Sequence, residues 1–466
     1  MTSKSNFTLN PRASVFSYKG GNYLFDPATR TYASINETLM SLITKPDNAN
    51  SFDEVSDNDY KDLQDVTGQL HKLGILILPE SLNNRDGNSS EQTDSVNHLT
   101  IFVTTKCNLK CAYCYANGGD AEKTITRDIW LPAIDHFFSS LSAGSAEGGV
   151  TNKRISLAIH GGGEPTIEFA TMKEIVADFC ERANAMGLQP SVGMGTNGTY
   201  NNSVHSWIIG NNINVNISLD GPRDIQNRLR PFRSGLPSYD IVTHNLSALV
   251  KEGRNVSIRA TITEEAADTM LETIELAKQL GLAKVHFEPV SLTGRCTATT
   301  IERPDAEKFA EKFLQCFLLG LKYDIDVHYS GMRCFENCHQ RFCGACGQNL
   351  CVTPDGNITT CYEVLDSKDP AAKEFFIGKV DLSKAMVVLD SARIEQLMQR
   401  VTTNMDACKE CFLRYQCAGD CPAKSFRYLN HDLYSPDPYR CQISNHINKQ
   451  LIAWLADGVI DPRNSE

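Results

Sequence analysis

The chain has 466 residues, of which 41% are apolar, and it carries a formal net charge of −11 at pH 7. This length leaves room for roughly two to four domains with sizeable cores, and the composition is that of a soluble globular protein. The acidic balance argues against a nucleic-acid-binding protein. No apolar run approaches the roughly 20 residues that span a bilayer, and the first residues lack the apolar core of a signal peptide. We therefore expect a cytoplasmic protein that makes no contact with a membrane.

The first 80 residues predict a small α+β domain of winged-helix-like type. Strand-like alternation between turn residues, followed by apolar residues at helical spacing, defines its expected elements: a hairpin of strands 14–18 and 22–26, a third strand at 31–35, helices at 37–43 and about 59–73, and a closing strand at 75–78. The second helix is expected to bury one apolar face, formed by Leu63, Val66, Leu70 and Leu73. Residues 81–97 are polar and rich in turn formers, which is typical of a linker.

From residue 98 onward, strand patterns alternate with helix patterns. The predicted strands are 99–104, 155–159, 191–194, 215–219, 256–262 and 284–288, and the predicted helices are about 127–142, 170–186, 202–209, 237–252, 265–280 and 304–322. Such alternation predicts a parallel sheet with right-handed crossovers, here a partial (β/α)6 barrel. The active site of such a barrel lies at the carboxyl ends of the strands.

Seventeen cysteines are unevenly distributed along the chain. None occurs before residue 107, three lie within 107–114, and eleven lie within 334–441. In a cytosolic chain of this size, clustered cysteines predict metal ligands rather than disulfides. Cys180 and Cys316 stand apart in apolar helical patterns, and we expect them to be core residues.

The first cysteine group follows the first barrel strand. Cys107, Cys111 and Cys114 have the spacing C-x3-C-x2-C. A structural zinc or an electron-transfer cluster takes four protein ligands, so three thiolates predict a cluster with one open position for an exogenous ligand. The next βα loop, residues 160–166, reads HGGGEPT. Its glycines allow a ligand to approach the backbone closely, and the Glu164 carboxylate is suited to accept hydrogen bonds from a ligand ammonium group.

Over about residues 98–322 the chain resembles the radical S-adenosylmethionine (SAM) superfamily. The resemblance is carried by Cys107, Cys111 and Cys114 with Tyr113, by the G-G-E-P run at 162–165, by T-N-G at 196–198 and by S-L-D-G-P at 218–222. It implies a 4Fe–4S cluster on the three cysteines, with SAM at the fourth iron. Reduction then cleaves SAM to a 5′-deoxyadenosyl radical, which abstracts a hydrogen atom from the substrate.

The same resemblance implies roles for individual residues. Gly162, Gly163 and Glu164 contact the methionine amino end of SAM, and Tyr113 lies near the adenine. Ser218 and Arg230 make polar contacts to SAM, and the arginine pairs with its carboxylate. For Arg230, a simple surface charge is the alternative interpretation.

The second cysteine-rich segment resembles the SPASM extension of radical SAM peptide maturases. In Cys343…Gly356…Cys361, twelve and four residues separate the three positions, and the run Cys408-x2-Cys411-x5-Cys417-x3-Cys421 is followed by Cys441. The turn sequence Pro354-Asp355-Gly356 predicts a hairpin that returns Cys361 towards Cys343.

This resemblance implies two auxiliary 4Fe–4S clusters. Cys408, Cys411, Cys417 and Cys441 hold one of them. Cys343, Cys361 and Cys421 hold the other, with Cys346 as the expected fourth ligand. Cys334, Cys338, Cys351 or a substrate thiolate are the alternatives for that fourth position. The alternative interpretation is that the same cysteines form two structural zinc sites.

The amino-terminal domain resembles the PqqD-like recognition domains of peptide-modifying enzymes. The matching features are N-Y-L-F-D-P at 22–27 and T-Y-A-S-I-N at 31–36, followed by an apolar helix. The resemblance implies that it holds the leader of a precursor peptide, in part by strand addition; a generic winged-helix cap is the alternative. The expected domains are the PqqD-like domain (1–80), the linker (81–97), the radical SAM core (98–325), the SPASM domain (326–445) and a C-terminal helix and tail (446–466).

Together these features predict a radical SAM oxidoreductase, or peptide cyclase, that cross-links a ribosomally synthesised precursor peptide. A thioether is the first choice of bond, followed by carbon–carbon or carbon–oxygen bonds. An electron donor such as flavodoxin or ferredoxin is expected as a partner. The alternatives are an epimerase, with Cys296 as hydrogen donor, and a formylglycine-type, sulfatase-like maturase. The latter is weakened because Tyr362 follows Cys361, where an acidic residue is expected. A non-catalytic metal-binding peptide scaffold is the alternative from another class.

Overall fold

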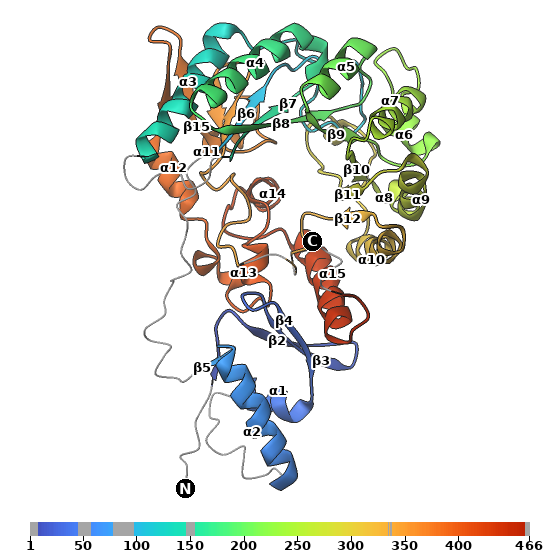
Figure 1. Ribbon diagram of the computed structural model, residues 1–466, viewed down its shortest axis with the longest axis vertical. Coiled ribbons are helices and arrows are strands. Elements are labelled where there is room, and N and C mark those ends of the chain that lie inside the picture. The colour runs from blue at the N-terminus through green and yellow to red at the C-terminus, as the bar shows by residue number, and fades with distance from the viewer. Residues whose placement is uncertain are drawn as a thin grey trace.

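The computed structural model describes residues 8–44, 57–77, 97–145, 154–333, 335 and 338–461. The predicted linker therefore lies outside the described residues apart from Asn97, and Cys334 also lies outside them. A small amino-terminal unit lies at one end of a larger body that contains the main sheet (Figure 1).

The amino-terminal unit contains the predicted hairpin. Strands β2 (Ser14–Tyr18), β3 (Gly21–Asp26) and β4 (Thr31–Ile35) form an antiparallel sheet in that order. Lys19 and Gly20 make the connecting turn with positive φ angles of 46° and 84°, the conformation that two-residue hairpins favour. Helix α1 (Glu37–Thr44) follows.

The second helix, α2 (Asp57–Lys72), buries a narrower face than predicted. Leu63 and Leu70 are buried, but Val66 and Leu73 are 39% and 50% exposed, so that part of the prediction is wrong. The buried stripe passes through Thr67 instead, because positions i, i+4 and i+7 face this small core together. The closing strand is β5 (Leu76–Ile77), which pairs with β1 (Thr8–Leu9); Leu78 lies outside the described residues.

The main sheet of the described residues contains all six predicted barrel strands. They are β6 (His98–Phe102), β7 (Arg154–His160), β8 (Gln189–Thr196), β9 (Asn214–Ser218), β10 (Ser257–Ile262) and β11 (Lys284–Pro289), and all neighbours pair in parallel. A further parallel strand, β12 (Asp326–His328), pairs with β11 and was not predicted. Three residues are too few to show an alternating pattern.

Helices connect these strands and lie along the outer rim of the sheet (Figure 1). They are α3 (Arg127–Ser145), α4 (Phe169–Ala185), α5 (Asn202–Gly210), α6 (Arg223–Leu229), α7 (Tyr239–Lys251), α8 (Glu264–Ala267), α9 (Met270–Leu280) and α10 (Ala306–Tyr323). The prediction of one helix at 265–280 is wrong, because the chain forms α8 and α9 there. The Thr269 hydroxyl donates to the Ala266 carbonyl at 3.0 Å, a local bond that competes with helix continuation.

The cysteine-rich region continues the same sheet. Strand β13 (Leu350–Val352) pairs in parallel with β6, and β14 (Asn357–Thr359), β15 (Phe376–Asp381) and β16 (Met386–Leu389) add antiparallel strands beyond it. The hairpin between β13 and β14 confirms the prediction for residues 354–356, and Gly356 has the positive φ of 79° that the turn requires. The result is one mixed sheet of eleven described strands.

Helices complete the carboxyl-terminal part. They are α11 (Ala372–Phe375), α12 (Ser391–Met398), α13 (Arg414–Cys417), α14 (Pro422–Tyr428) and α15 (Pro438–Ala456). Helix α15 begins ahead of the expected boundary at 446, so Cys441 lies in its first turn. None of the described helices combines the length and apolar character that a bilayer-spanning helix requires.

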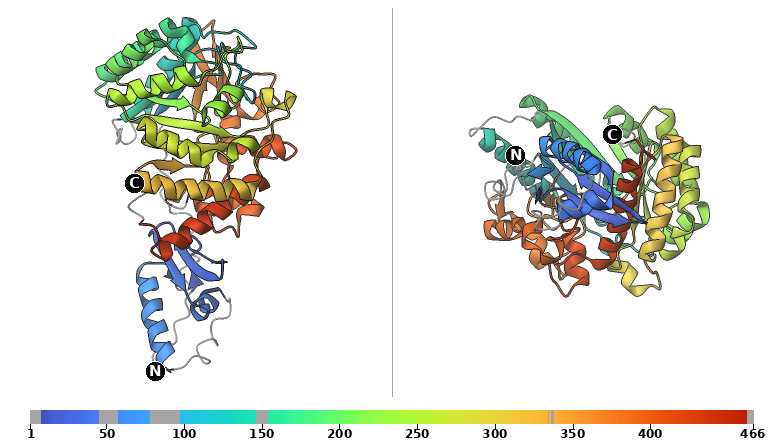
Figure 2. Two further views of the ribbon diagram at one scale, coloured as in Figure 1. Left: turned by 90° about the vertical axis from the view of Figure 1, so that its right-hand side faces the viewer. Right: turned by 90° about the horizontal axis from the view of Figure 1, so that it is seen from below.

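Helix α15 lies between the amino-terminal unit and the larger body (Figure 2). Tyr23 donates to the Asp457 carboxylate at 3.2 Å, and the Tyr18 hydroxyl lies 3.3 Å from Gln450 Oε1. The Phe16 ring packs on Phe412, with centroids 4.9 Å apart, in the segment directly after Cys411. The unit is therefore joined to the cysteine-rich region through its sheet.

Helix α10 packs closely against β12 at the buried residue Gly320, and a substitution there tests this contact. A Cβ at Gly320 would lie 2.7 Å from the Ile325 carbonyl oxygen and would also meet Val327. Alanine favours helices by about 1 kcal/mol over glycine, yet we expect Gly320→Ala to lower the free energy of unfolding by about 1–3 kcal/mol through overpacking. Gly210→Ala in α5, where a Cβ meets nothing within 4 Å, is the matched control. Urea denaturation followed by circular dichroism compares them, and equal stability of the two variants would contradict the close packing.

Candidate active site at the carboxyl ends of the parallel strands

The first cysteine group lies in the loop after β6, which we call the Cys loop (residues 104–120). Backbone hydrogen bonds hold this loop against the segment after α6: Lys110 N donates to Pro231 O at 2.8 Å, and Ala112 N donates to Leu229 O at 2.9 Å. The loop is thus fixed at the carboxyl end of β6, where the sequence predicts the active site.

The glycine run after β7 packs directly on the Cys loop. Gly163 N donates to Thr104 O at 3.0 Å, and Glu164 N donates to Lys106 O at 2.7 Å. A Cβ at Gly163 would lie 2.6 Å from the Thr105 carbonyl carbon and would also meet Lys106 O. Only glycine allows this approach of two backbones, so the run has a structural role besides its expected contact with SAM.

Glu164 joins this loop to the end of β8. Its side chain is 1% exposed and accepts hydrogen bonds from the Thr166 hydroxyl (2.7 Å), the Thr196 hydroxyl (2.7 Å) and Asn197 N (2.6 Å). Burial raises the pKa of this carboxyl, and these hydrogen bonds oppose the rise. Because its oxygens already have several donors, the carboxylate holds two βα loops together, and its contact with a ligand ammonium stays a prediction.

The three thiols of the Cys loop lie close to one another. Burial, and next the Cys111 thiol, raises the pKa of Cys107 to about 12. Burial raises the pKa of Cys111 to about 11, with Arg230 opposing this and Cys114 adding to it. Such mutual effects between thiols require short separations.

Each of these sulfurs also has a donor group beside it. Gly118 N lies 3.3 Å from Cys114 Sγ, Asn197 Nδ2 lies 4.0 Å from Cys107 Sγ, and Arg230 Nη1 lies 3.9 Å from Cys111 Sγ. Donors that face sulfur stabilise thiolate ligands, so this donor set fits an iron–sulfur cluster. Among the described residues, no three His, Cys, Asp or Glu side chains surround a position for a single metal ion.

Arg230 is buried rather than a surface charge. It is 9% exposed, its Nε donates to Asp220 Oδ2 at 2.9 Å, and its guanidinium lies 5.2 Å from the centre of the Tyr113 ring. Although burial lowers the pKa of Arg230, the Asp220 carboxylate outweighs this and holds it well above the usual value. Arg230, Tyr113 and the half-buried Ser218 at the end of β9 therefore lie in one region beside the Cys loop.

Asp220 belongs to the S-L-D-G-P run at 218–222, but the sequence predicts no individual role for it. It is fully buried and accepts hydrogen bonds from the Tyr113 hydroxyl and from Thr261 N, the latter at 3.0 Å. It thereby links the Cys loop to β9 and β10. A signal was present in the sequence, because Asp220 directly follows a strand end in the S-L-D-G run.

Four cysteines gather as the first auxiliary set. Burial, and then Cys421 and Cys346, raises the pKa of Cys343. Burial raises the pKa of Cys361, and Glu363, Cys421 and Cys343 add to the rise. The structure thus brings Cys343, Cys346, Cys361 and Cys421 together.

Two of the alternatives for the fourth position lie in other surroundings. Cys351 is buried on β13, opposite Thr100 of β6. Burial, and then Asp26, raises the pKa of Cys338, so this thiol lies towards the amino-terminal unit.

The second auxiliary set gathers around Cys417. Burial raises its pKa, and Asp420, Cys441, Cys411 and Cys408 add to the rise. Burial, Asp420, Cys411 and Cys408 raise the pKa of Cys441 to about 12. Cys408, Cys411, Cys417 and Cys441 thus influence one another, and the assignment of the two sets to two clusters stays a prediction.

Tyr115, Glu363 and Lys424 lie between the Cys loop and the first auxiliary set, and we call the region around these three side chains the chamber. Burial, and then Glu363, Cys114 and Cys361, raises the pKa of Tyr115, so its phenol lies between the two cysteine groups. Glu363 Oε2 is buried and has no hydrogen-bond partner among the described residues. Lys424 is 6% exposed, with Nζ 3.4 Å from Glu288 Oε1 and 3.8 Å from Glu363 Oε1. The sequence did not predict a role at the site for these three chamber residues, Tyr115, Glu363 and Lys424.

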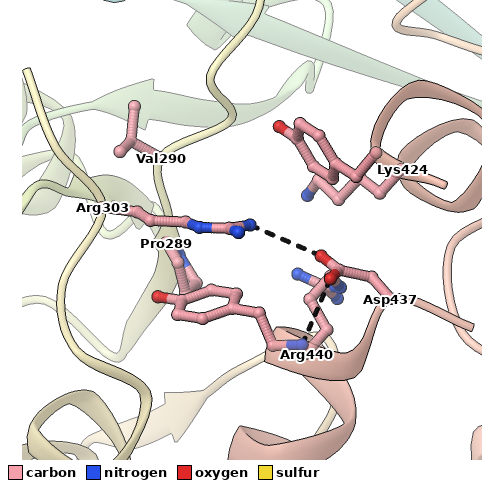
Figure 3. Close-up of a pocket in the computed structure, with 8 residues that line it drawn as sticks. Pro289, Val290, Arg303, Lys424, Asp437 and Arg440 are labelled. Carbon is pink, nitrogen blue, oxygen red and sulfur yellow. Dashed lines mark hydrogen bonds and ion pairs between the residues drawn. The ribbon is translucent and has the colours of Figure 1, made fainter. Parts of the chain in front are cut away.

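A small cleft at the end of β11 includes Lys424 in its lining. Figure 3 shows Arg303 reaching across it towards Asp437, which lies on the same side as Lys424 and Arg440. Arg303 lies 4.1 Å from the Tyr439 ring centre, and its Nη1 lies 3.5 Å from Asp437 Oδ2. The cleft is therefore lined by charges that are largely paired.

Cys296, the expected hydrogen donor of an epimerase, is buried beside Ile301. It is 3% exposed, and its Sγ lies 4.0 Å from the Ile301 carbonyl oxygen. Its neighbour Arg295 instead supports the Cys loop, donating to Cys111 O at 2.9 Å and to Gly118 O at 3.0 Å.

No protein-family model matches the chain. A serine-type anaerobic sulfatase-maturating enzyme of Bacteroides thetaiotaomicron is 20% identical over 365 residues, which cover 70% of this chain and 82% of that protein. A cysteine-type enzyme of the same name from Clostridium novyi is 21% identical over 344 residues, covering 70% and 88%. An uncharacterized protein of Methanocaldococcus jannaschii is 27% identical over 196 residues, and this match spans 42% of the chain and 63% of that protein.

Solved structures show the same fold. The structure of anSMEcpe with bound AdoMet has a TM-score of 0.60 at 17% identity, over 78% of this chain and 96% of that chain. The structure of SuiB from Streptococcus suis bound to S-adenosylmethionine has a TM-score of 0.50 at 17% identity, over 93% and 99%. The chain therefore has the α/β fold with a large mixed sheet that these structures have.

The neighbourhoods of the cysteines predict which thiol completes the first auxiliary set. We expect Cys346→Ala to lower the iron content by about four of about twelve atoms per chain, because one 4Fe–4S cluster loses a ligand. Cys338→Ala and Cys351→Ala are the controls and should keep their iron, because these thiols lie in other surroundings. Iron is measured after anaerobic reconstitution. Loss of iron in either control with full retention in Cys346→Ala would contradict this assignment.

Proposed function

We propose that this chain is a radical SAM enzyme that cross-links a ribosomally synthesised precursor peptide after hydrogen abstraction. A thioether is the first choice of bond, and carbon–carbon or carbon–oxygen bonds come next. The observation that carries the proposal is the arrangement of the cysteines. A group of three, with a donor beside each sulfur, faces a group of four across a polar chamber at the carboxyl ends of the parallel strands.

In this proposal the three cysteines hold a 4Fe–4S cluster whose open iron binds SAM. When bound and reduced, SAM supplies the 5′-deoxyadenosyl radical. Gly162, Gly163 and Glu164 form the wall beside its methionine end, and Tyr113 lies beside the adenine. Arg230 is held in place by Asp220 and presents its guanidinium to the SAM carboxylate.

The chain's own residues then select the peptide and shield the reacting bond. The amino-terminal unit holds the leader, and its attachment to α15 keeps the leader near the chamber. Buried polar groups around the chamber exclude water from the reacting C–H bond. The auxiliary cysteines would hold a cluster that could accept the electron released by cross-linking, and a flavodoxin or ferredoxin would serve as the electron donor.

A formylglycine-type maturase is the second candidate function. Glu363 favours it, because this carboxylate stands two residues after Cys361 with a buried oxygen that has no partner among the described residues. The relatives named as sulfatase-maturating enzymes also favour it. The epimerase alternative keeps Cys296 as its expected hydrogen donor.

The Cys loop provides the first test. We expect the anaerobically reconstituted protein to hold about twelve iron atoms and, with dithionite and SAM, to release 5′-deoxyadenosine. Cys107→Ala should lose this release and about four iron atoms. Cys180→Ala, in the outer helix α4, should keep both. Deoxyadenosine from Cys107→Ala, or two zinc ions in place of iron, would contradict the proposal.

Product analysis separates the candidate reactions. With the small peptide encoded beside the gene as substrate, a cross-link removes two hydrogen atoms and leaves no aldehyde. Formylglycine formation instead yields a product that reacts with an aldehyde probe, and epimerisation leaves the mass unchanged. We expect the cross-linked product in mass spectra, and an aldehyde or an unchanged mass would favour the corresponding alternative.

A further inference from the structure

Arg259 lies on β10, which pairs with a parallel strand on each side. On β10, Ile258, Ala260 and Ile262 are fully buried, whereas Arg259 between them is exposed. The side chains of a strand alternate between two faces, so Arg259 faces the barrel interior while its neighbours pack under the outer helices. It pairs in register with Ser218 of β9 and His286 of β11, which share its face.

The guanidinium of Arg259 lies among the groups that line the chamber. Burial, and then Arg259, lowers the pKa of His160 to about 4. Its charge also opposes the rise that burial and Glu363 cause in the pKa of Tyr115. A positive charge that is felt by both groups stands between β7 and the Cys loop, inside the barrel.

Arg259 differs from the other arginines of the site because it has no partner. Arg230 pairs with Asp220 at 2.9 Å, Arg295 with Asp120 at 2.9 Å and Arg440 with Glu288 at 2.6 Å. Among the described residues, no hydrogen bond or ion pair reaches the guanidinium of Arg259.

The nearest acid on the inner face is already engaged. Glu288 accepts from Arg440 at 2.6 Å and from the Ser330 hydroxyl at 3.0 Å, and Lys424 Nζ lies 3.4 Å from the same oxygen. Although burial raises the pKa of Glu288, Arg440 and Lys424 hold it well below the usual value. Because Glu288 already has these partners, the guanidinium donors of Arg259 stay available for an incoming carboxylate. An arginine can bind a carboxylate through two parallel hydrogen bonds.

We infer that Arg259 binds a carboxylate side chain, Asp or Glu, of the substrate peptide inside the barrel. This inference rests on the proposed function, since it places the peptide in the chamber. SAM also carries a carboxylate, but Arg230 beside the Cys loop is the partner expected for it. Arg259 pairs in register with His286 of β11, two residues before Glu288, whose Oε1 lies 3.4 Å from Lys424 Nζ.

The test measures peptide and SAM binding in the reconstituted full-length protein. Equilibrium dialysis with SAM present compares the probe peptides acetyl-Ala-Glu-Ala-amide and acetyl-Ala-Gln-Ala-amide, which differ in one charge. We expect the protein to bind the Glu peptide about tenfold more tightly, as a charge-assisted hydrogen-bonded pair allows. Arg259→Gln should lose this preference. Arg228→Gln, which removes an exposed arginine paired with Glu265 outside the barrel, should keep it.

The outcomes are distinguishable. A protein without preference for the Glu peptide, or an Arg259→Gln variant that keeps the preference, overturns the inference. Weaker SAM binding in Arg259→Gln with an unchanged peptide preference assigns the carboxylate to SAM and overturns it as well. Failure of the unaltered protein to cleave SAM refutes the proposed function, while the Glu preference and its loss in Arg259→Gln still decide the role of Arg259.

Discussion

The contact between two backbones, that of Gly163 and that of the Cys loop, is the constraint on which the site depends. Two hydrogen bonds, of 3.0 and 2.7 Å, join the loop after β7 to the loop after β6 at a distance that excludes any side chain on Gly163. Glu164 extends this contact to the end of β8 through buried hydrogen bonds. Three successive βα loops are thereby fixed relative to one another. The three thiols consequently hold fixed positions relative to the sheet. A cluster with one open coordination position requires such preorganised ligands, because they must leave that position accessible.

The local parts of this arrangement could be predicted from the sequence. Cysteine spacing, the hairpin at residues 14–26 and the turn at 354–356 depend on residues that are close in the chain, and their signals are strong. The pairing of β13 with β6 could not be predicted, because it joins residues about 250 positions apart through strands of three to five residues. Asp220 and Glu363 were missed for a related reason: a lone carboxylate after a strand or a cysteine looks like a turn residue until its buried partners are known. Arg259 was missed because a charged residue within an otherwise apolar strand is expected to face solvent, and here the solvent is the interior of the barrel.

The cysteine-rich region and the barrel form one chamber because buried charges join them. Arg440 of α15 is 2% exposed and binds Glu288 of β11 at 2.6 Å and Asp420 at 2.8 Å, next to Cys421. Removal of one member of such a network leaves an uncompensated buried charge, which typically costs several kcal/mol, whereas its intact form contributes little net stability. The network therefore mainly fixes the position of the cysteine-rich region relative to β11, and we call it the lock between these two parts of the chain. This lock explains why the second auxiliary set, whose Cys441 neighbours Arg440, keeps a fixed position relative to the strand ends.

The same lock gives the chamber its electrostatic character. Although burial raises the pKa of Glu288, the positive charges of Arg440 and Lys424, with a smaller contribution from Arg259, hold it well below the usual value. Arg259 in turn disfavours a second positive charge on His160, whose pKa lies near 4. The groups in this region thus include the neutral imidazole of His160, the carboxylate of Glu288, which has several partners, and the guanidinium of Arg259, for which the described residues provide no hydrogen bond or ion pair. A peptide carboxylate bound as inferred above would meet a guanidinium that no hydrogen bond or ion pair from the described residues reaches. In that case Arg259 on β10 would orient the peptide, and Arg230, directly after α6, would bind the SAM carboxylate.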